Sequence, residues 1–258
     1  MAEILKISEA FGKGRAALMP YFTVGYPDFE TSLDVIEACV EAGADLMELG
    51  MPFSDPLADG PTIQHSTQVA LENGITVVRC LEAVKELRSR GVAIPLILMG
   101  YINPILAYGL GKFVTEAAQA GANGFIIPDL PPEEAGEMGS RSRQLGLDLI
   151  FLLPPNSSDE RMQFVTQQSS GFVYLVSVLG ITGERAALPV ELAQFVRRVR
   201  THTEKPLAVG FGISTPEQAA AVGEIADGII VGSALIKAVG GTDDPVTAAR
   251  EFVLSLKG

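Results

Sequence analysis

The sequence has 258 residues, of which 47% are hydrophobic and 19% charged, and its formal net charge is −12. This length and composition allow one large buried core or two small ones, and the acidic balance argues against nucleic acid or an anionic membrane surface as a partner. The longest apolar run, residues 92–99, is far shorter than a membrane span, and the N-terminal residues lack the apolar stretch of a signal peptide. We therefore expect a soluble, cytoplasmic protein whose Cys39 and Cys80 are reduced core thiols.

Eight short apolar runs recur along the chain, each followed by a polar loop and then an amphipathic stretch. They lie at residues 17–24, 45–49, 95–99, 124–127, 148–152, 172–177, 206–210 and 227–231. Runs that are continuously apolar are typical of parallel strands covered on both faces. Eight β-then-α units in about 250 residues predict an α/β fold, the (β/α)8 or TIM barrel, as a single domain over residues 1–258. The alternative, an open doubly wound sheet, lacks its glycine fingerprint after the first strand.

Helical patterns fill the gaps between these runs, and glycine closes several of them. Residues 31–43 and 189–202 are typical, and an extra helix at about 61–72 precedes the regular one at 76–90. Glycine stands where a left-handed residue would end a helix, at Gly43, Gly91, Gly121 and Gly146. The extra helix lies on the side of a barrel that carries the active site. We interpret residues 11–15, before the first run, as a flexible lead-in.

Two glycine-rich turns follow the last two predicted strands, at residues 210–215 and 231–237. Barrel enzymes often bind phosphate at these two loops, where the N-terminus of a short helix offers free N–H groups. Gly212, Gly232 and Ser233 are the candidate phosphate contacts. The alternative is a pair of ordinary turns that need glycine for their backbone geometry.

Three acids follow one another in the stretch DLMELGMPFSDPLADGPT, residues 45–62. Glu48 lies at the end of the second apolar run, where desolvation would raise its pKa toward the range useful for proton transfer; alternatively it faces outward and pairs with a lysine. Asp59 is either an N-cap-region residue of the extra helix or a second carboxylate over the barrel mouth. Asp55 has the chemistry of a turn residue.

The remaining candidates are apolar side chains and a loop. Residues that could form an apolar pocket are Met19, Tyr21, Phe22, Met99 and Phe211, although most residues of this kind are core. The loop at 177–189 could close over the site, or be an ordinary loop. His65 and His202, the only two histidines, are expected at the surface, so no metal or nucleophile–histidine site is predicted. Carboxylate acid/base chemistry on a phosphorylated substrate remains, and an unrelated phosphosugar enzyme is one form of it.

The motif ELGMPFSDPLADGPTIQHS at residues 48–66 resembles the signature of the tryptophan synthase alpha chain family. Further similar segments follow in order over nearly the whole chain, at residues 20–27, 100–105, 126–134, 174–183, 210–214 and 231–237. The resemblance implies a barrel that cleaves indole-3-glycerol phosphate to indole and glyceraldehyde 3-phosphate. It makes Glu48 the catalytic acid/base and Asp59 the acid at the indole nitrogen.

The resemblance also assigns the substrate contacts. Tyr174 is similar to a tyrosine near the glycerol, Thr182 and Gly183 to the closing loop, and Phe211 to a pocket aromatic. Gly183 also approaches the phosphate, together with Gly212, Gly232 and Ser233. At Tyr21 the chain departs from the phenylalanine of familiar members.

The resemblance implies a partner as well: a tryptophan synthase beta chain in an alpha2-beta2 heterotetramer, which holds pyridoxal phosphate and receives indole. No cofactor is expected in this chain. Pro52, Asp55 and Asn103 match positions near that interface. Two alternatives stay open within the family: a lyase that releases indole without a beta chain, and a weakly active chain that mainly binds and regulates one.

Overall fold

Parallel strands form a ring in the computed structural model, which describes residues 3–177, 190–210 and 212–257. The strands are β1 Ala17–Thr23, β2 Met47–Gly50, β3 Leu96–Met99, β4 Gly124–Ile126, β5 Asp148–Ile150, β6 Leu152–Leu153, β7 Val173–Val176, β8 Leu207–Gly210 and β9 Gly228–Val231. Their order is β5-β4-β3-β2-β1-β9-β8-β7-β6. The first strand pairs with the last, β9, as well as with β2, and the two ends of this order, β5 and β6, are separated only by Phe151. The ends of the sheet therefore meet, so the open doubly wound sheet is excluded and the predicted barrel is confirmed.

The fifth predicted strand is split in two. β5 pairs with β4 and β6 pairs with β7, and only Phe151 separates them. The Phe151 N–H donates to Ser169 Oγ at 3.1 Å, while its carbonyl oxygen accepts from Tyr174 N at 3.2 Å. The serine hydroxyl therefore replaces one ladder bond, and the segment 148–153 still closes the ring between β4 and β7.

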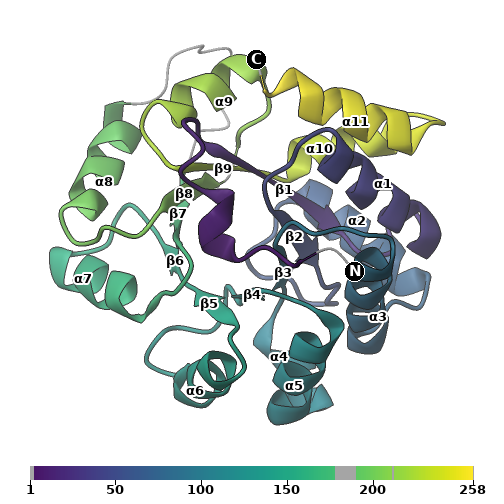
Figure 1. Ribbon diagram of the computed structural model, residues 1–258, viewed down its shortest axis with the longest axis horizontal. Helices are drawn as coiled ribbons and strands as arrows, with labels where there is room; N and C mark the ends of the chain where they lie inside the picture. Colours follow the sequence, from purple (N-terminus) through teal and green to yellow (C-terminus); the bar gives the residue numbers. More distant parts are fainter. Residues whose placement is uncertain (1–2, 178–189, 211, 258) are drawn as a thin grey trace.

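Helices surround the ring of strands, as Figure 1 shows. They are α1 Phe29–Glu41, α2 Pro61–Glu72, α3 Val77–Ser89, α4 Ile102–Tyr108, α5 Leu110–Ala120, α6 Gly136–Gln144, α7 Asp159–Gln168, α8 Val190–Arg200, α9 Pro216–Gly223, α10 Ser233–Gly240 and α11 Pro245–Ser255. The extra helix expected after the second strand is α2, with the predicted bounds. The four glycines predicted at helix ends all have positive φ. Across the described ranges, no helix combines the length and the apolarity that crossing a membrane requires.

The core has two layers, one inside the ring of strands and one between strands and helices. The inner layer includes Met19, Leu46, Ile97, Phe172 and Ile230, and the outer layer takes the alternate residues of the same strands. Side chains alternate between the two faces of a strand. Burial on both faces explains why the sequence shows continuous apolar runs.

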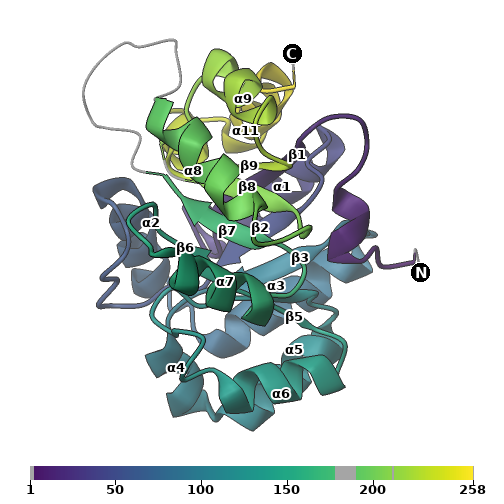
Figure 2. The same cartoon turned by 90° about the vertical axis from the view of Figure 1, so that its left-hand side faces the viewer.

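The N-terminal segment closes one end of the barrel. A 3-10 helix, Ile7–Ala10, contributes Ile7 to the inner layer, and it is the purple turn near the centre of Figure 1. In Figure 2 this turn and α2 lie at opposite ends of the barrel. The interpretation of residues 11–15 as a flexible lead-in was wrong, because Arg15 (2.6 Å) and Lys13 (3.0 Å) form ion pairs with the buried Asp45. That carboxylate also accepts from Leu18 N, so the lead-in is tied to β1.

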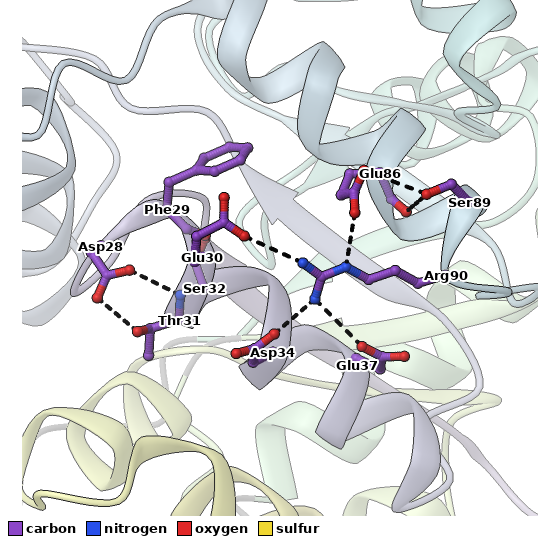
Figure 3. A network of polar contacts seen from close by, with 10 residues as sticks. All are labelled: Asp28, Phe29, Glu30, Thr31, Ser32, Asp34, Glu37, Glu86, Ser89 and Arg90. Carbon is purple, nitrogen blue, oxygen red and sulfur yellow. Dashed lines mark hydrogen bonds and ion pairs between the residues drawn. The ribbon is translucent and has the colours of Figure 1, made fainter.

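On the outside of the barrel, one arginine joins α1 and α3, as Figure 3 shows. The guanidinium of Arg90 lies 2.7 Å from Asp34, 3.3 Å from Glu30, 3.5 Å from Glu37 and 3.2 Å from Glu86. Exposed pairs of this kind contribute at most about 1 kcal/mol each. The network therefore adds little to stability beside the packing of the two helices.

Candidate active site

Glu48 lies inside the barrel at the carboxyl end of β2. Leu46, two residues earlier, belongs to the inner layer, and alternation along the strand directs Glu48 to the same side. Its side chain is fully buried, and neither carboxyl oxygen has a hydrogen-bond partner among the described residues. Burial raises the pKa of Glu48 well above its usual range. The structure therefore excludes the outward-facing, lysine-paired alternative and favours a protonated acid.

Two tyrosines, Tyr21 and Tyr174, each pack over a glycine of the neighbouring strand at the carboxyl end of the barrel. In the parallel ladders, Tyr21 is level with Glu48, and Tyr174 is level with Ala208. Two residues further along the neighbouring strand stand Gly50 and Gly210, where a Cβ would lie 2.1 Å and 2.2 Å from the respective tyrosine hydroxyls. Each tyrosine thus occupies the space that a glycine leaves open. Burial raises the pKa of both hydroxyls, so both remain neutral hydrogen-bonding groups.

Asp59 lies in the loop between β2 and α2. The N-cap of α2 is Gly60, so Asp59 is not the capping residue, and its side chain is available to the mouth. Burial raises its pKa to about 6, and a hydrogen bond from the Tyr101 side chain lowers it in part. Tyr101 Oη also accepts from Ala58 N at 2.9 Å. Burial therefore has the larger effect on the pKa of Asp59, and the hydrogen bond from Tyr101 offsets part of the rise.

The two glycine turns lie at the carboxyl ends of β8 and β9. Ser233 is the first residue of α10, and its N-cap, Gly232, makes no side-chain capping bond. The first N–H groups of a helix lack intrahelical acceptors, so the start of α10 can donate to an anion. Gly212 has φ +85° and is exposed. The chain thus presents backbone donors near Tyr21, whose Cβ lies 3.3 Å from an ideal Cβ on Gly232.

The other predicted site residues fall into three groups. Met99 is half-buried at the end of β3, level with Gly50. Thr182, Gly183 and Phe211, with almost all of the loop at 177–189, lie outside the described residues. Asp55 and Asn103 are exposed and Pro52 is partly exposed.

Sequence reasoning gave no role to Tyr101, Thr23 or Ser66. Tyr101 lies two residues after β3, as the N-cap of α4, and a polar aromatic residue just past the carboxyl end of a barrel strand is a signal that could have identified it. Thr23 and Ser66 are fully buried and hydrogen-bonded to each other at 2.8 Å. No pattern in the sequence indicates that pairing. Among the described residues, no group of three or more metal-ligating side chains could hold a metal ion.

The sequence profile of the tryptophan synthase alpha chain family matches residues 7–256. The chain belongs to this family. The tryptophan synthase alpha chain of Dehalococcoides mccartyi is 51% identical over 252 residues, which cover 98% of both chains. Among solved structures, the alpha subunit from Legionella pneumophila has a TM-score of 0.87 at 40% identity, covering 94% of this chain and 91% of that one. Tryptophan synthase from M. tuberculosis, in its aminoacrylate-bound form, gives 0.85 at 38% identity, covering 94% and 92%.

The tryptophan synthase alpha chain is a carbon–carbon lyase of tryptophan biosynthesis. It cleaves indole-3-glycerol phosphate into indole and glyceraldehyde 3-phosphate, and this is the reaction of the present chain. The resemblance of residues 48–66 is confirmed over nearly the whole chain.

Proposed function

We propose that Glu48 is the acid/base of indole-3-glycerol phosphate cleavage. The observation that supports this role is a fully buried carboxyl without a hydrogen-bond partner among the described residues, at the carboxyl end of a barrel strand. A buried acid with a raised pKa holds its proton near neutral pH, where it can protonate a weak carbon base. Leaving this carboxyl unpaired costs stability, which a substrate-binding role accounts for.

Cleavage requires two proton movements, and Glu48 can make both. Its proton goes to C3 of the indole ring, which makes the ring an electron-accepting iminium. The resulting carboxylate takes the proton of the hydroxyl on the adjacent side-chain carbon. The bond between C3 and that carbon breaks, its electron pair restores the aromatic ring, and the carbon becomes the aldehyde of glyceraldehyde 3-phosphate.

We propose that Asp59 accepts a hydrogen bond from the indole N–H. Protonation at C3 places positive charge on that nitrogen, so an ionised carboxylate stabilises the transition state more than the ground state. With a pKa of about 6, Asp59 is mostly ionised at pH 7 while Glu48 stays protonated. Two carboxyl groups in different environments thus take different roles.

The remaining contacts follow the length of the substrate. We propose that the phosphate binds at Gly212, Gly232 and Ser233, where α10 presents free N–H groups. Tyr174 is assigned to the glycerol, and Tyr21, Met99 and Phe211 to the indole ring. Thr182 and Gly183 are assigned to the loop that closes over the substrate. In this arrangement Asp59 contacts the indole nitrogen and Glu48 lies at the scissile bond. The backbone donors of the phosphate site bind the phosphate at the other end of the substrate.

We propose that the partner is a tryptophan synthase beta chain in an alpha2-beta2 heterotetramer, and that pyridoxal phosphate belongs to that partner rather than to this chain. The supporting surface is the β2–α2 loop with the start of α4, where Pro52, Asp55 and Asn103 lie. The side chain of Leu57 in this loop is 92% exposed. A hollow of about 390 Å³ lies beside the loop, lined by Phe53 and Pro56 and by Pro61, Gln64 and His65 of α2. We also propose a single domain over residues 1–258 and a cytoplasmic location.

The test is indole release by the purified chain, alone and with a beta chain. Glu48→Gln keeps the shape of the side chain but removes the exchangeable carboxyl proton. Turnover should therefore fall by about three orders of magnitude, with substrate binding retained. Asp148→Asn is the matched control. Burial also raises the pKa of the Asp148 carboxyl, but Asp148 is the first residue of β5, whereas Glu48 lies at the carboxyl end of its strand. Near-normal turnover of Glu48→Gln would refute the assignment. A large stimulation by the beta chain would exclude the stand-alone lyase.

A further inference from the structure

Three buried hydroxyls form a chain from β1 to α2. Tyr21 Oη lies 3.5 Å from Thr23 Oγ1, and Thr23 Oγ1 lies 2.8 Å from Ser66 Oγ. Ser66 Oγ in turn donates to the carbonyl oxygen of Ile63, one turn earlier in α2, at 2.9 Å. Thr23 and Ser66 are fully buried, so no bulk water competes for these bonds.

The distances determine the direction in which the protons point. A hydroxyl has one proton to donate, and Ser66 uses its proton on the Ile63 carbonyl. The 2.8 Å contact then requires Thr23 to donate to Ser66, which leaves Thr23 Oγ1 as an acceptor toward Tyr21. In the reverse arrangement Ser66 would donate to Thr23 and Thr23 to Tyr21, which keeps the 2.8 Å and 3.5 Å contacts but gives up the 2.9 Å bond to Ile63, so it is the weaker of the two. Tyr21 therefore directs its proton to Thr23 and presents oxygen lone pairs elsewhere.

Those lone pairs lie beside an unpartnered acid. Tyr21 is level with Glu48 in the ladder, and its hydroxyl passes over Gly50, two residues after Glu48. Protonated Glu48 needs an acceptor for its proton, and neither of its oxygens has one among the described residues. A water molecule or the substrate hydroxyl can bridge the acid and the tyrosine oxygen.

Other titratable groups also face this region. Tyr174 reaches it from β7, Asp59 from the β2–α2 loop, and Tyr101, which hydrogen-bonds to Asp59, from the end of β3. Negative charge on Asp59 acts on both Tyr21 and Tyr174. Burial raises the pKa of Glu48, so Tyr21 adds to an existing preference for the neutral acid.

We propose that Tyr21 is a positioning residue whose oxygen, oriented by Thr23 and Ser66, favours the protonated form of Glu48 by accepting a hydrogen bond from it through one bridging hydroxyl. The inference rests on the proposed role of Glu48. The Tyr21 hydroxyl thereby has a function, whereas packing against the indole ring would need only the aromatic ring. The inference also extends the acid's surroundings to α2, the extra helix.

The test measures the pKa of Glu48 by NMR titration of the chain carrying carbon-13-labelled glutamate carboxyls. The signal missing in Glu48→Gln identifies Glu48 without any reference to activity. Tyr21→Phe should lower that pKa by about 0.5–1 unit, the equivalent of one hydrogen bond, and should move the alkaline limb of kcat/KM for indole release to lower pH by the same amount. Tyr26→Phe is the control, because Tyr26 is also buried but its hydroxyl lies against Gly240 of α10.

Ser66→Ala separates the hydroxyl chain from simple packing. Without the serine oxygen, Thr23 donates to Tyr21, and the tyrosine proton turns toward Glu48, which stabilises the carboxylate. The pKa should therefore fall here too, but not further in Tyr21→Phe/Ser66→Ala than in Tyr21→Phe. Ser255→Ala, which loses the same kind of helix carbonyl bond, should have no effect. An unchanged or raised pKa in Tyr21→Phe, or a Ser66→Ala shift that persists without the tyrosine hydroxyl, would overturn the inference. Retained turnover in Glu48→Gln would instead contradict the proposed function alone.

Discussion

Gly50→Ala tests the packing of the mouth, because a single methyl group would collide with Tyr21. An ideal Cβ at this position would lie 2.1 Å from the hydroxyl oxygen, 2.5 Å from Cζ and 2.8 Å from Cε2. Favourable contacts between such atoms begin at about 3.5 Å, so the Tyr21 ring must move by roughly 1 Å or more. Overpacking of this kind costs about 1–3 kcal/mol. We expect that loss in the free energy of unfolding.

The assay combines urea unfolding with indole release. Gly136→Ala is the matched control, since nothing lies within 4 Å of its ideal Cβ, and its stability should stay within about 1 kcal/mol of the parent. In a double-mutant cycle, Tyr21→Leu removes all three colliding atoms, so Gly50→Ala should cost less in that background. Tyr21→Phe should rescue it only in part, because Cζ and Cε2 remain. If Gly50→Ala matches Gly136→Ala in both stability and turnover, the steric reasoning is wrong.

Two further predictions concern the carboxylates of Asp45 and Asp59. Asp45→Asn should lower the free energy of unfolding at pH 7 by about 2–3 kcal/mol, less than a fully buried pair because Arg15 and Lys13 are partly exposed. The ionised partners lower the pKa of Asp45 in the folded chain. The stabilisation is therefore complete above the unfolded-state pKa of about 4 and disappears as the pH falls through the folded-state pKa. A difference in free energy of unfolding between parent and Asp45→Asn that stays constant from pH 7 to pH 2 would contradict this. Asp59 must be ionised to hold the indole N–H, so with its pKa at about 6 kcat/KM should fall about tenfold per unit below pH 6. Tyr101→Phe removes a bond that lowers this pKa and should move the acid limb upward, and a limb that stays in place would refute the pairing.

The sequence predicted the barrel because each strand is buried on both faces, which leaves a local apolar signature. Glu48 could be identified for the same reason, since a carboxyl within such a run must either be paired or serve chemistry. The extra helix was also a local pattern. Features that depend on distant partners could not be predicted: Ser169 splits the fifth strand at Phe151, and Ser66 meets a threonine 43 residues away.

The lead-in shows the same limit. The glycines of residues 11–15 indicate flexibility, yet Lys13 and Arg15 are held by Asp45, about 30 residues later. The pKa of Asp59 likewise depends on Tyr101, the N-cap residue of α4. In both cases a contact with a residue distant in the sequence determines the property, and local composition alone does not reveal that contact.

The pairing of β1 with β9 has a consequence for how the chain is made. During synthesis on a ribosome, β2 follows β1 closely, but β9, the second neighbour of β1, emerges only after strands β2 to β8 have been made. Until then one edge of β1 keeps unpaired backbone groups, and such an edge invites pairing with other chains. α11 packs against α1 and joins it through an ion pair between Arg250 and Glu41. A helix made after β9 therefore secures the seam that β1 had to leave open.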